Sequence, residues 1–295
     1  MMIVDSQVHI WAADTPDRPW PPGQAGRAHQ PTPLTAEALL EKMDAADVDR
    51  AILVPPSWEG DRNDVALAAA HRYPGRFAVM GRLSLEAPES RKEFLPLVHM
   101  EGMLGLRFTF HTQDQQKLLT GGAADWLWPA AEAAGVPLMV HPPHCLPLID
   151  AIAEGHPNLR LVIDHLGLMR PNVDHAAFAH LSGVLALAKR PNIAVKASAV
   201  TDYSSEPYPH PILHGYLRQV FDAFGPKRMF WGSDISRVRH PYRQMITLFT
   251  EELDWLSEDD KAWIMGRGLC EWLKWPISAS EKSSINEKRT TRGLG

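Results

Sequence analysis

Cysteine is scarce in this chain, and the marks of several protein classes are absent. The 2 cysteines, Cys145 and Cys270, have neither the spacing of a metal site nor the number that a disulfide framework needs, which is typical of a reducing compartment. No apolar run approaches the ~18 residues needed to cross a bilayer. Residues 1–9 lack the charged and then apolar order of a signal peptide. We therefore expect a cytoplasmic protein with no membrane partner.

Clusters of basic residues are absent as well. The net charge is −5, and the 30 Lys and Arg residues are scattered along the chain, which argues against nucleic acid as a partner. No glycine-rich phosphate-binding motif follows the first predicted strand. With 45% hydrophobic and 22% charged residues, the composition is that of an ordinary folded domain. A small molecule is the expected partner, and the oligomeric state stays open, a homo-oligomer included.

Short and almost continuously apolar runs alternate with longer helical patterns. Each run is typical of a parallel strand buried on both faces. The expected strands are Met2–His9, Ala51–Pro55, Phe77–Leu83, Leu104–Phe108, Pro137–His141, Arg160–His165, Ile193–Ala199 and Met229–Ser233. The expected helices include Thr35–Ala46, Asn63–Arg72, Asp125–Ala134, Leu146–Glu154, Pro211–Phe224 and finally Asp259–Trp272. This alternation predicts a single-domain α/β fold, a (β/α)₈ TIM barrel, with an open doubly wound sheet as the alternative.

Two segments interrupt the alternation. Trp11–Pro33 is rich in proline, glycine and tryptophan and is too long for an ordinary βα turn, so we expect a lid over the barrel mouth. Residues 277–295 are polar and lack periodicity, which predicts a disordered or surface-bound tail. The barrel is thus expected to span residues 1–276.

Histidines stand at the carboxyl ends of three predicted strands, and in a TIM barrel these ends form the active site. They are His9, His141 and His165, and Asp234 follows the eighth strand. Imidazole and carboxylate are the ligands that a catalytic divalent ion needs. We expect these side chains to share one pocket. For the other histidines considered, we expect surface or core positions; these are His29, His71, His99, His156, His175, His180 and His214.

Two cationic side chains are also candidates for this pocket. Arg107 lies near the end of strand 4, and Lys196 interrupts the apolar strand 7, where an unpaired ammonium would be costly to bury. Gln7 lies two residues before His9, so both should point into the barrel.

Several of these segments resemble one known family. Val162–Gly167 (VIDHLG), Val195–Ser198 (VKAS), Phe230–Asp234 (FWGSD) and Ile3–Trp11 (IVDSQVHIW) are similar to the amidohydrolase-related, 2-pyrone-4,6-dicarboxylate lactonase-like metal-dependent hydrolases. The resemblance covers residues 1 to about 276. It implies a distorted (β/α)₈ barrel that hydrolyses lactones, with relatives that cleave amides or decarboxylate small acids. Arg107 matches an arginine that holds a substrate carboxylate in that family.

The first strand departs from the family pattern. The family usually has His-x-His at this point, whereas Gln7 replaces the first histidine here, and an amide oxygen is a poor zinc ligand. The resemblance therefore leaves two possibilities open. Either one divalent ion, zinc or manganese, is held by His9, His141, His165 and Asp234, or the enzyme works without a metal.

The expected reaction is the opening of a small carboxylated lactone, or of a cyclic amide. Asp234 would act as general base, and His165 and His9, or a metal, would stabilise the oxyanion. The expected substrate contacts are Gln7, Trp11, Arg107, His144 and Lys196, and Trp58 is a further candidate for the pocket wall. The alternatives are a metal-dependent decarboxylase on the same scaffold and a catalytically silent barrel that only binds a ligand.

Overall fold

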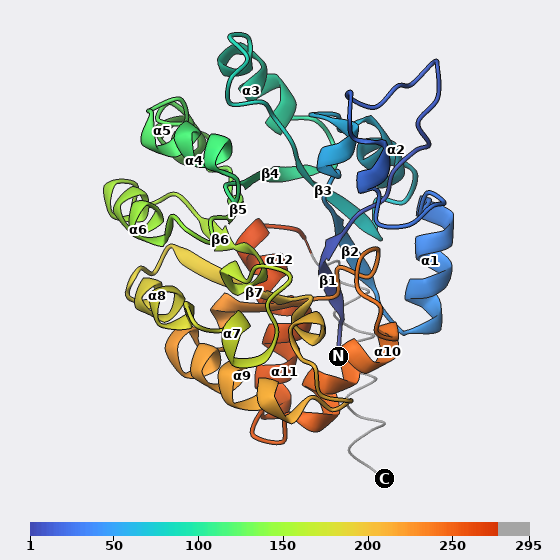
Figure 1. Ribbon diagram of the computed structural model, residues 1–295, viewed down its shortest axis with the longest axis vertical. Helices are drawn as coiled ribbons and strands as arrows, with labels where there is room; N and C mark the ends of the chain where they lie inside the picture. The colour runs from blue at the N-terminus through green and yellow to red at the C-terminus, as the bar shows by residue number, and fades with distance from the viewer. Residues whose placement is uncertain (277–295) are drawn as a thin grey trace.

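The predicted strands form one eight-stranded parallel sheet in which each strand pairs with the next along the chain. The structure, a computed structural model, describes residues 1–276 and is shown in Figure 1. The strands are β1 Val4–Val8, β2 Arg50–Leu53, β3 Phe77–Gly81, β4 Met103–Thr109, β5 Leu138–His141, β6 Leu161–Ile163, β7 Ile193–Ser198 and β8 Met229–Gly232. Every expected strand is therefore confirmed, with ends shifted by a few residues.

Helices follow the strands and surround them (Figure 1). They are α1 Ala36–Ala45, α2 Asp64–Arg72, α3 Ser90–Val98, α4 Gln113–Thr120, α5 Leu127–Ala134, α6 Leu146–Gly155, α7 Asp174–Ala177, α8 Leu181–Ala186, α9 Pro211–Phe224, α10 Tyr242–Thr247, α11 Glu258–Ala262 and α12 Gly268–Leu273. The last expected helix is divided, because a π-helical turn, Trp263–Arg267, separates α11 from α12. The arrangement is the predicted single-domain (β/α)₈ barrel, and the open-sheet alternative is wrong. The expected tail lies outside the described residues.

The barrel closes between β8 and β1 through a few specific bonds. The backbone N–H of Asp234 donates to the carbonyl of Gln7 at 2.9 Å. Asp5, which is fully buried, accepts hydrogen bonds from the backbone N–H of Ser233 at 2.9 Å and from the Tyr242 hydroxyl at 2.7 Å. Gly232 makes the approach possible, because a Cβ there would lie 2.4 Å from the Ser6 hydroxyl oxygen. The first strand is thereby tied to the turn that carries Asp234.

An irregularity in β1 decides which of its side chains face the interior. Val4 packs in the inner apolar cluster and Val8 in the outer one, although four residues of regular strand would place both on one face. The register of the pairing with β2 shifts between Asp5 and Val8, as in a β-bulge. Gln7 and His9 therefore both point inward, and their side chains lie within hydrogen-bond distance.

The barrel interior is filled at its amino-terminal end and polar at its carboxyl end. The inner cluster includes Val4, Ile52, Met80, Met139, Val162 and Phe230, and Leu269, Cys270 and Leu273 of α12 complete it from below. Lys196, two residues after Ala194 of the same cluster, lies above this layer. The apolar floor thus leaves the carboxyl end of the barrel for polar side chains.

The loop Trp11–Pro33 lies beside the barrel mouth and is held by charges. Its Arg18 pairs with Asp64 at the start of α2 at 2.8 Å and with the buried Glu59. Glu59 also accepts the backbone N–H of Ala12 at 3.1 Å. None of the helices in residues 1–276 has the length and apolar character that crossing a membrane requires.

Candidate active site

A cavity of about 310 Å³ opens at the carboxyl ends of the strands. Its walls come from strand ends and from the loops that follow β1, β2, β4, β6, β7 and β8. The lining residues are His9, Arg27, His29, Pro56, Ser57, Trp58, Arg107, Thr109, His111, His141, His165, Leu168, Met169, Arg170, Tyr203, Asp234 and Arg237. The three strand-end histidines thus share this cavity with Arg107 and Asp234.

The hydrogen bonds of His9 and His141 fix their neutral forms. Nδ1 of His9 lies 2.6 Å from the carbonyl oxygen of Val54, which can only accept, so Nδ1 carries the proton. Nε2 of His141 donates in the same way to the carbonyl of Leu168 at 2.9 Å. Burial lowers the pKa of His9 well below its usual range and that of His141 to about 3, and the Arg107 charge adds to both shifts. Both rings are neutral at physiological pH.

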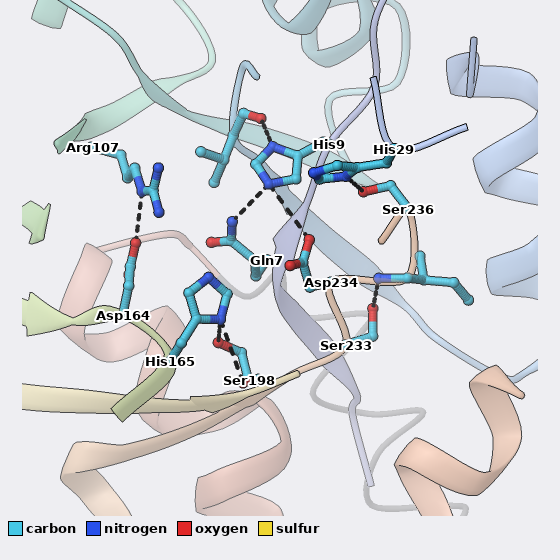
Figure 2. Close-up of polar contacts among 12 residues, drawn as sticks. Gln7, His9, His29, Arg107, Asp164, His165, Ser198, Ser233, Asp234 and Ser236 are labelled. Atoms are coloured by element: carbon cyan, nitrogen blue, oxygen red, sulfur yellow. Dashed lines mark hydrogen bonds and ion pairs between the residues drawn. The ribbon is translucent and has the colours of Figure 1, made fainter. Parts of the chain in front are cut away.

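His165 has one ring nitrogen engaged and one left for the cavity. Its Nδ1 lies 2.8 Å from the Ser198 hydroxyl and 3.4 Å from the Ser198 carbonyl oxygen, and the second nitrogen points away from Ser198 (Figure 2). The backbone at His165 is left-handed, with φ 52°, where β6 ends. A non-glycine residue is costly there, of order 1 kcal/mol or more, and such conformations persist only where the surroundings impose them.

Asp234 also has a left-handed backbone, with φ 53°, and is almost fully buried. Its Oδ1 lies 3.5 Å from Nε2 of His9 (Figure 2). Burial raises the pKa of the Asp234 carboxyl to about 7, although Arg237, Arg170 and Arg107 oppose the shift. A carboxyl group with this pKa can both take up and release a proton near neutral pH.

Beneath the cavity, one buried carboxylate holds two cations. Asp164 is fully buried, and its Oδ1 lies 2.8 Å from the ammonium nitrogen of Lys196, while its Oδ2 accepts the Nε hydrogen of Arg107 at 2.8 Å. Burial alone would raise the pKa of Asp164, but the charges of Lys196 and Arg107 outweigh it and hold the pKa well below the usual range. Arg107 makes no other hydrogen bond to the described part of the chain, so its two terminal nitrogens remain for a ligand.

Four expected substrate contacts do not line the cavity. Lys196 and Gln7 lie below it, fully buried, because the ammonium binds both Asp164 and the amide oxygen of Gln7. Trp11 packs edge-to-face behind Trp58, with ring centroids 5.4 Å apart, and Trp58 forms the wall. His144 is exposed on the surface after β5.

The cavity also holds residues that sequence reasoning missed. His29, for which we expected a surface or core position, lines the cavity wall. Its Nδ1 lies 3.2 Å from the Ser236 hydroxyl, within hydrogen-bond distance. Burial lowers the pKa of His29 to about 3. Three further cavity arginines, Arg27, Arg170 and Arg237, come from loops, where no periodic pattern marks them. His111 follows β4 by two residues, a position that a search of strand ends could have found.

These side chains do not fit the metal site that the family pattern suggests. The lone pair of His9 Nε2 already accepts a hydrogen from the Gln7 amide at 3.1 Å, and Nδ1 of His141, which has the lone pair of that ring, lies 3.5 Å from Nδ1 of His111. Within residues 1–276, no three His, Cys, Asp or Glu side chains are grouped so that they could hold an ion. The four expected ligands, His9, His141, His165 and Asp234, line one cavity without converging on one point.

Comparison with known sequences gives a match over most of the chain. The family model described as amidohydrolase matches residues 4–267. L-fucono-1,5-lactonase of Burkholderia ambifaria is 28% identical over 257 residues, which cover 80% of this chain and 81% of the lactonase.

Solved structures show the same fold. An amidohydrolase from Burkholderia multivorans with bound zinc has a TM-score of 0.76 and 22% identity, over 94% of this chain and 100% of that chain. A probable 2-pyrone-4,6-dicarboxylic acid hydrolase from Acinetobacter baumannii, with citric acid bound, has a TM-score of 0.69 and 19% identity, over 93% of this chain and 100% of that chain.

The Asp164 pairs make a prediction about stability. Asp164→Asn leaves Lys196 and Arg107 buried without their counter-charge, so we expect the free energy of unfolding to fall by about 3–5 kcal/mol. Adding Lys196→Met to Asp164→Asn should restore about 1–3 kcal/mol, because one stranded cation is removed. Urea unfolding of the three proteins measures both values. A double variant less stable than Asp164→Asn would contradict this account.

Proposed function

This chain belongs to the amidohydrolase family, and we propose that it hydrolyses a small lactone that carries at least one carboxylate. The observation that carries the proposal is the charge of the cavity. Asp234 is the single carboxylate among its lining residues, and it faces four arginines, Arg27, Arg107, Arg170 and Arg237. The similarity to L-fucono-1,5-lactonase supports the lactone as the reacting group.

In the proposed reaction, Asp234 is the general base. Its carboxyl group lines the cavity that would hold the attacking water, and its Oδ1 accepts no hydrogen bond from the described residues. Asp234 removes a proton from that water as the oxygen attacks the lactone carbonyl carbon. The protonated Asp234 then gives the proton to the leaving alkoxide. The same carboxyl group thus acts first as general base and then as general acid.

His165 is the proposed donor to the oxyanion. In the tautomer that this role requires, the Ser198 hydroxyl donates to Nδ1, and the proton of the neutral ring is on the nitrogen that faces the cavity. His9, which we expected to share this role, has its only N–H turned to the Val54 carbonyl. An N–H already fixed toward the position where charge develops lowers the barrier without reorganisation.

The arginines supply the proposed substrate selectivity. The terminal nitrogens of Arg107 can form a fork on a substrate carboxylate, because Asp164 holds the guanidinium through Nε alone. Asp202 pairs with Arg170 through one terminal nitrogen of the guanidinium.

The direct test is a pH-indicator screen of carboxylated lactones and cyclic amides with enzyme that has been exhaustively chelated. We expect proton release from one or more lactones without loss of carbon. Release of carbon dioxide would indicate a decarboxylase instead. Tight binding of these compounds without any turnover would indicate a binding protein.

Substitution of the base is the sharper test of the mechanism. Asp234→Asn should lower kcat by at least ~10²-fold with the fold intact, the usual size of a general-base effect. In the parent enzyme the base works only when it has lost its proton. Because its pKa is about 7, kcat/KM should rise with pH up to about 7 and level off above. A profile that falls across this range, or an active Asp234→Asn variant, would refute the assignment.

Arg107 is tested through the charge of the substrate. Arg107→Lys replaces the fork by a point charge, so transition-state binding of an acidic lactone should weaken by roughly 1.5–3 kcal/mol. The neutral methyl ester of the same lactone is the control, and its kcat/KM should change much less. An equal loss for acid and ester would mean that Arg107 serves only the structure around Asp164.

A further inference from the structure

Lys196 is a buried cation, and its ammonium group determines which atoms of the neighbouring polar groups face it. It lies inside the barrel on β7 and is fully buried. Its ammonium pairs with Asp164 at 2.8 Å and donates to the Gln7 amide oxygen, to the Ser6 carbonyl at 3.3 Å and to the Met139 sulfur at 3.4 Å. An ammonium group only donates hydrogen bonds, so every atom that it contacts must be an acceptor.

This requirement settles the orientation of the Gln7 amide. The amide oxygen must face Lys196, because the reversed amide would place its NH₂ group against the ammonium. The NH₂ group consequently points the other way, where it lies 3.1 Å from Nε2 of His9 (Figure 2). Lys196 therefore determines, through Gln7, that His9 in the cavity wall faces a hydrogen-bond donor.

His9 accepts this hydrogen bond through Nε2. Its Nδ1 hydrogen is used by the Val54 carbonyl at 2.6 Å, so Nε2 has only a lone pair, and the Gln7 amide donates to it. When Asp234 is ionised, its Oδ1, 3.5 Å from Nε2, is also an acceptor. Two acceptors cannot hydrogen-bond to each other, so His9 leaves the ionised form of the proposed base unpaired.

We propose that Lys196 is a positioning residue: through the Gln7 amide it keeps Nε2 of His9, which lies beside Asp234, without a proton, and so keeps the ionised Asp234 free to bind water. Lys196 and Gln7 act from below the cavity and touch no substrate. Without the ammonium, the amide can reverse, and its oxygen then faces Nε2. His9 can then carry its proton on Nε2, where two acceptors replace the one, the Val54 carbonyl, that Nδ1 gives up. A hydrogen bond from Nε2 to Oδ1 would then occupy the proposed base.

The test observes His9 directly. Protein with ¹⁵N-labelled histidine reports which ring nitrogen carries the proton, with His9 assigned by comparison with His9→Gln. In the parent protein we expect the proton of His9 on Nδ1. In Lys196→Met, which keeps Asp164 paired with Arg107, we expect the form with the proton on Nε2 to appear. We also expect kcat to fall about tenfold or more while KM stays within about twofold, because the base and not the substrate contact is affected.

Gln7→Glu is the second variant, in case Lys196→Met does not fold. A carboxylate keeps the contact with Lys196 but has no hydrogen to donate to Nε2, so a proton should appear on Nε2 of His9 and kcat should fall by a similar factor. Met139→Leu is the matched control. It changes another buried contact of the same ammonium and should alter neither the His9 signals nor kcat.

A His9 proton on Nε2 in the parent protein would overturn the proposal. So would unchanged His9 signals in Gln7→Glu, or a loss of kcat in Lys196→Met with the His9 signals unchanged. The kinetic part rests on the proposed lactone hydrolysis, whereas the nitrogen spectra require no substrate. A protein that hydrolyses no lactone but shows the expected spectra would therefore refute the proposed function and leave the positioning of His9 intact.

Discussion

Asp164 is a carboxylate without access to water that lies between the ammonium of Lys196 and the guanidinium of Arg107. Charges in such surroundings are tolerated only where partners compensate for the lost hydration, so each of the three side chains holds the others in place. Arg107 comes from β4, Lys196 from β7 and Asp164 from the residue after β6, so the pairing links these three strands. From this group, Arg107 extends upward to the cavity and Lys196 extends across to β1. The upper part of the barrel depends on this pairing of charges as its lower part depends on apolar packing.

Asp5 shows the other way to bury a carboxylate in the same barrel. It is fully buried and is met by hydrogen-bond donors instead of cations, namely the backbone N–H groups of Gln7 and Ser233 and the hydroxyls of Ser233 and Tyr242. These bonds hold the end of β8 against β1 and support the left-handed backbone at Asp234. Asp234 itself has neither arrangement. Its Oδ1 lacks both a cation at contact distance and a donor among the described residues, which agrees with its raised pKa.

The fold could be predicted because apolar runs and helical patterns are local signals, and so could the residues at strand ends. His9, His141, His165, Arg107 and Asp234 reach one cavity because parallel strands end on the same side. The role of Lys196 could not be predicted, since a single lysine in an apolar strand does not reveal which partner on which strand it meets. The same holds for His29, Arg27, Arg170 and Arg237, whose loops have no period that could place them. Gln7 was visible as a departure from the family pattern, but its orientation depends on Lys196.

The four guanidinium groups of the cavity have a consequence for the end of the catalytic cycle. Opening a lactone turns an uncharged ester into a carboxylate and a hydroxyl, so the ring-opened acid has one negative charge more than the ring from which it came. A cavity lined by Arg27, Arg107, Arg170 and Arg237 attracts that acid more strongly than the lactone. Under the proposed reaction, the arginines therefore slow the departure of the acid, and dissolved salt weakens that hold.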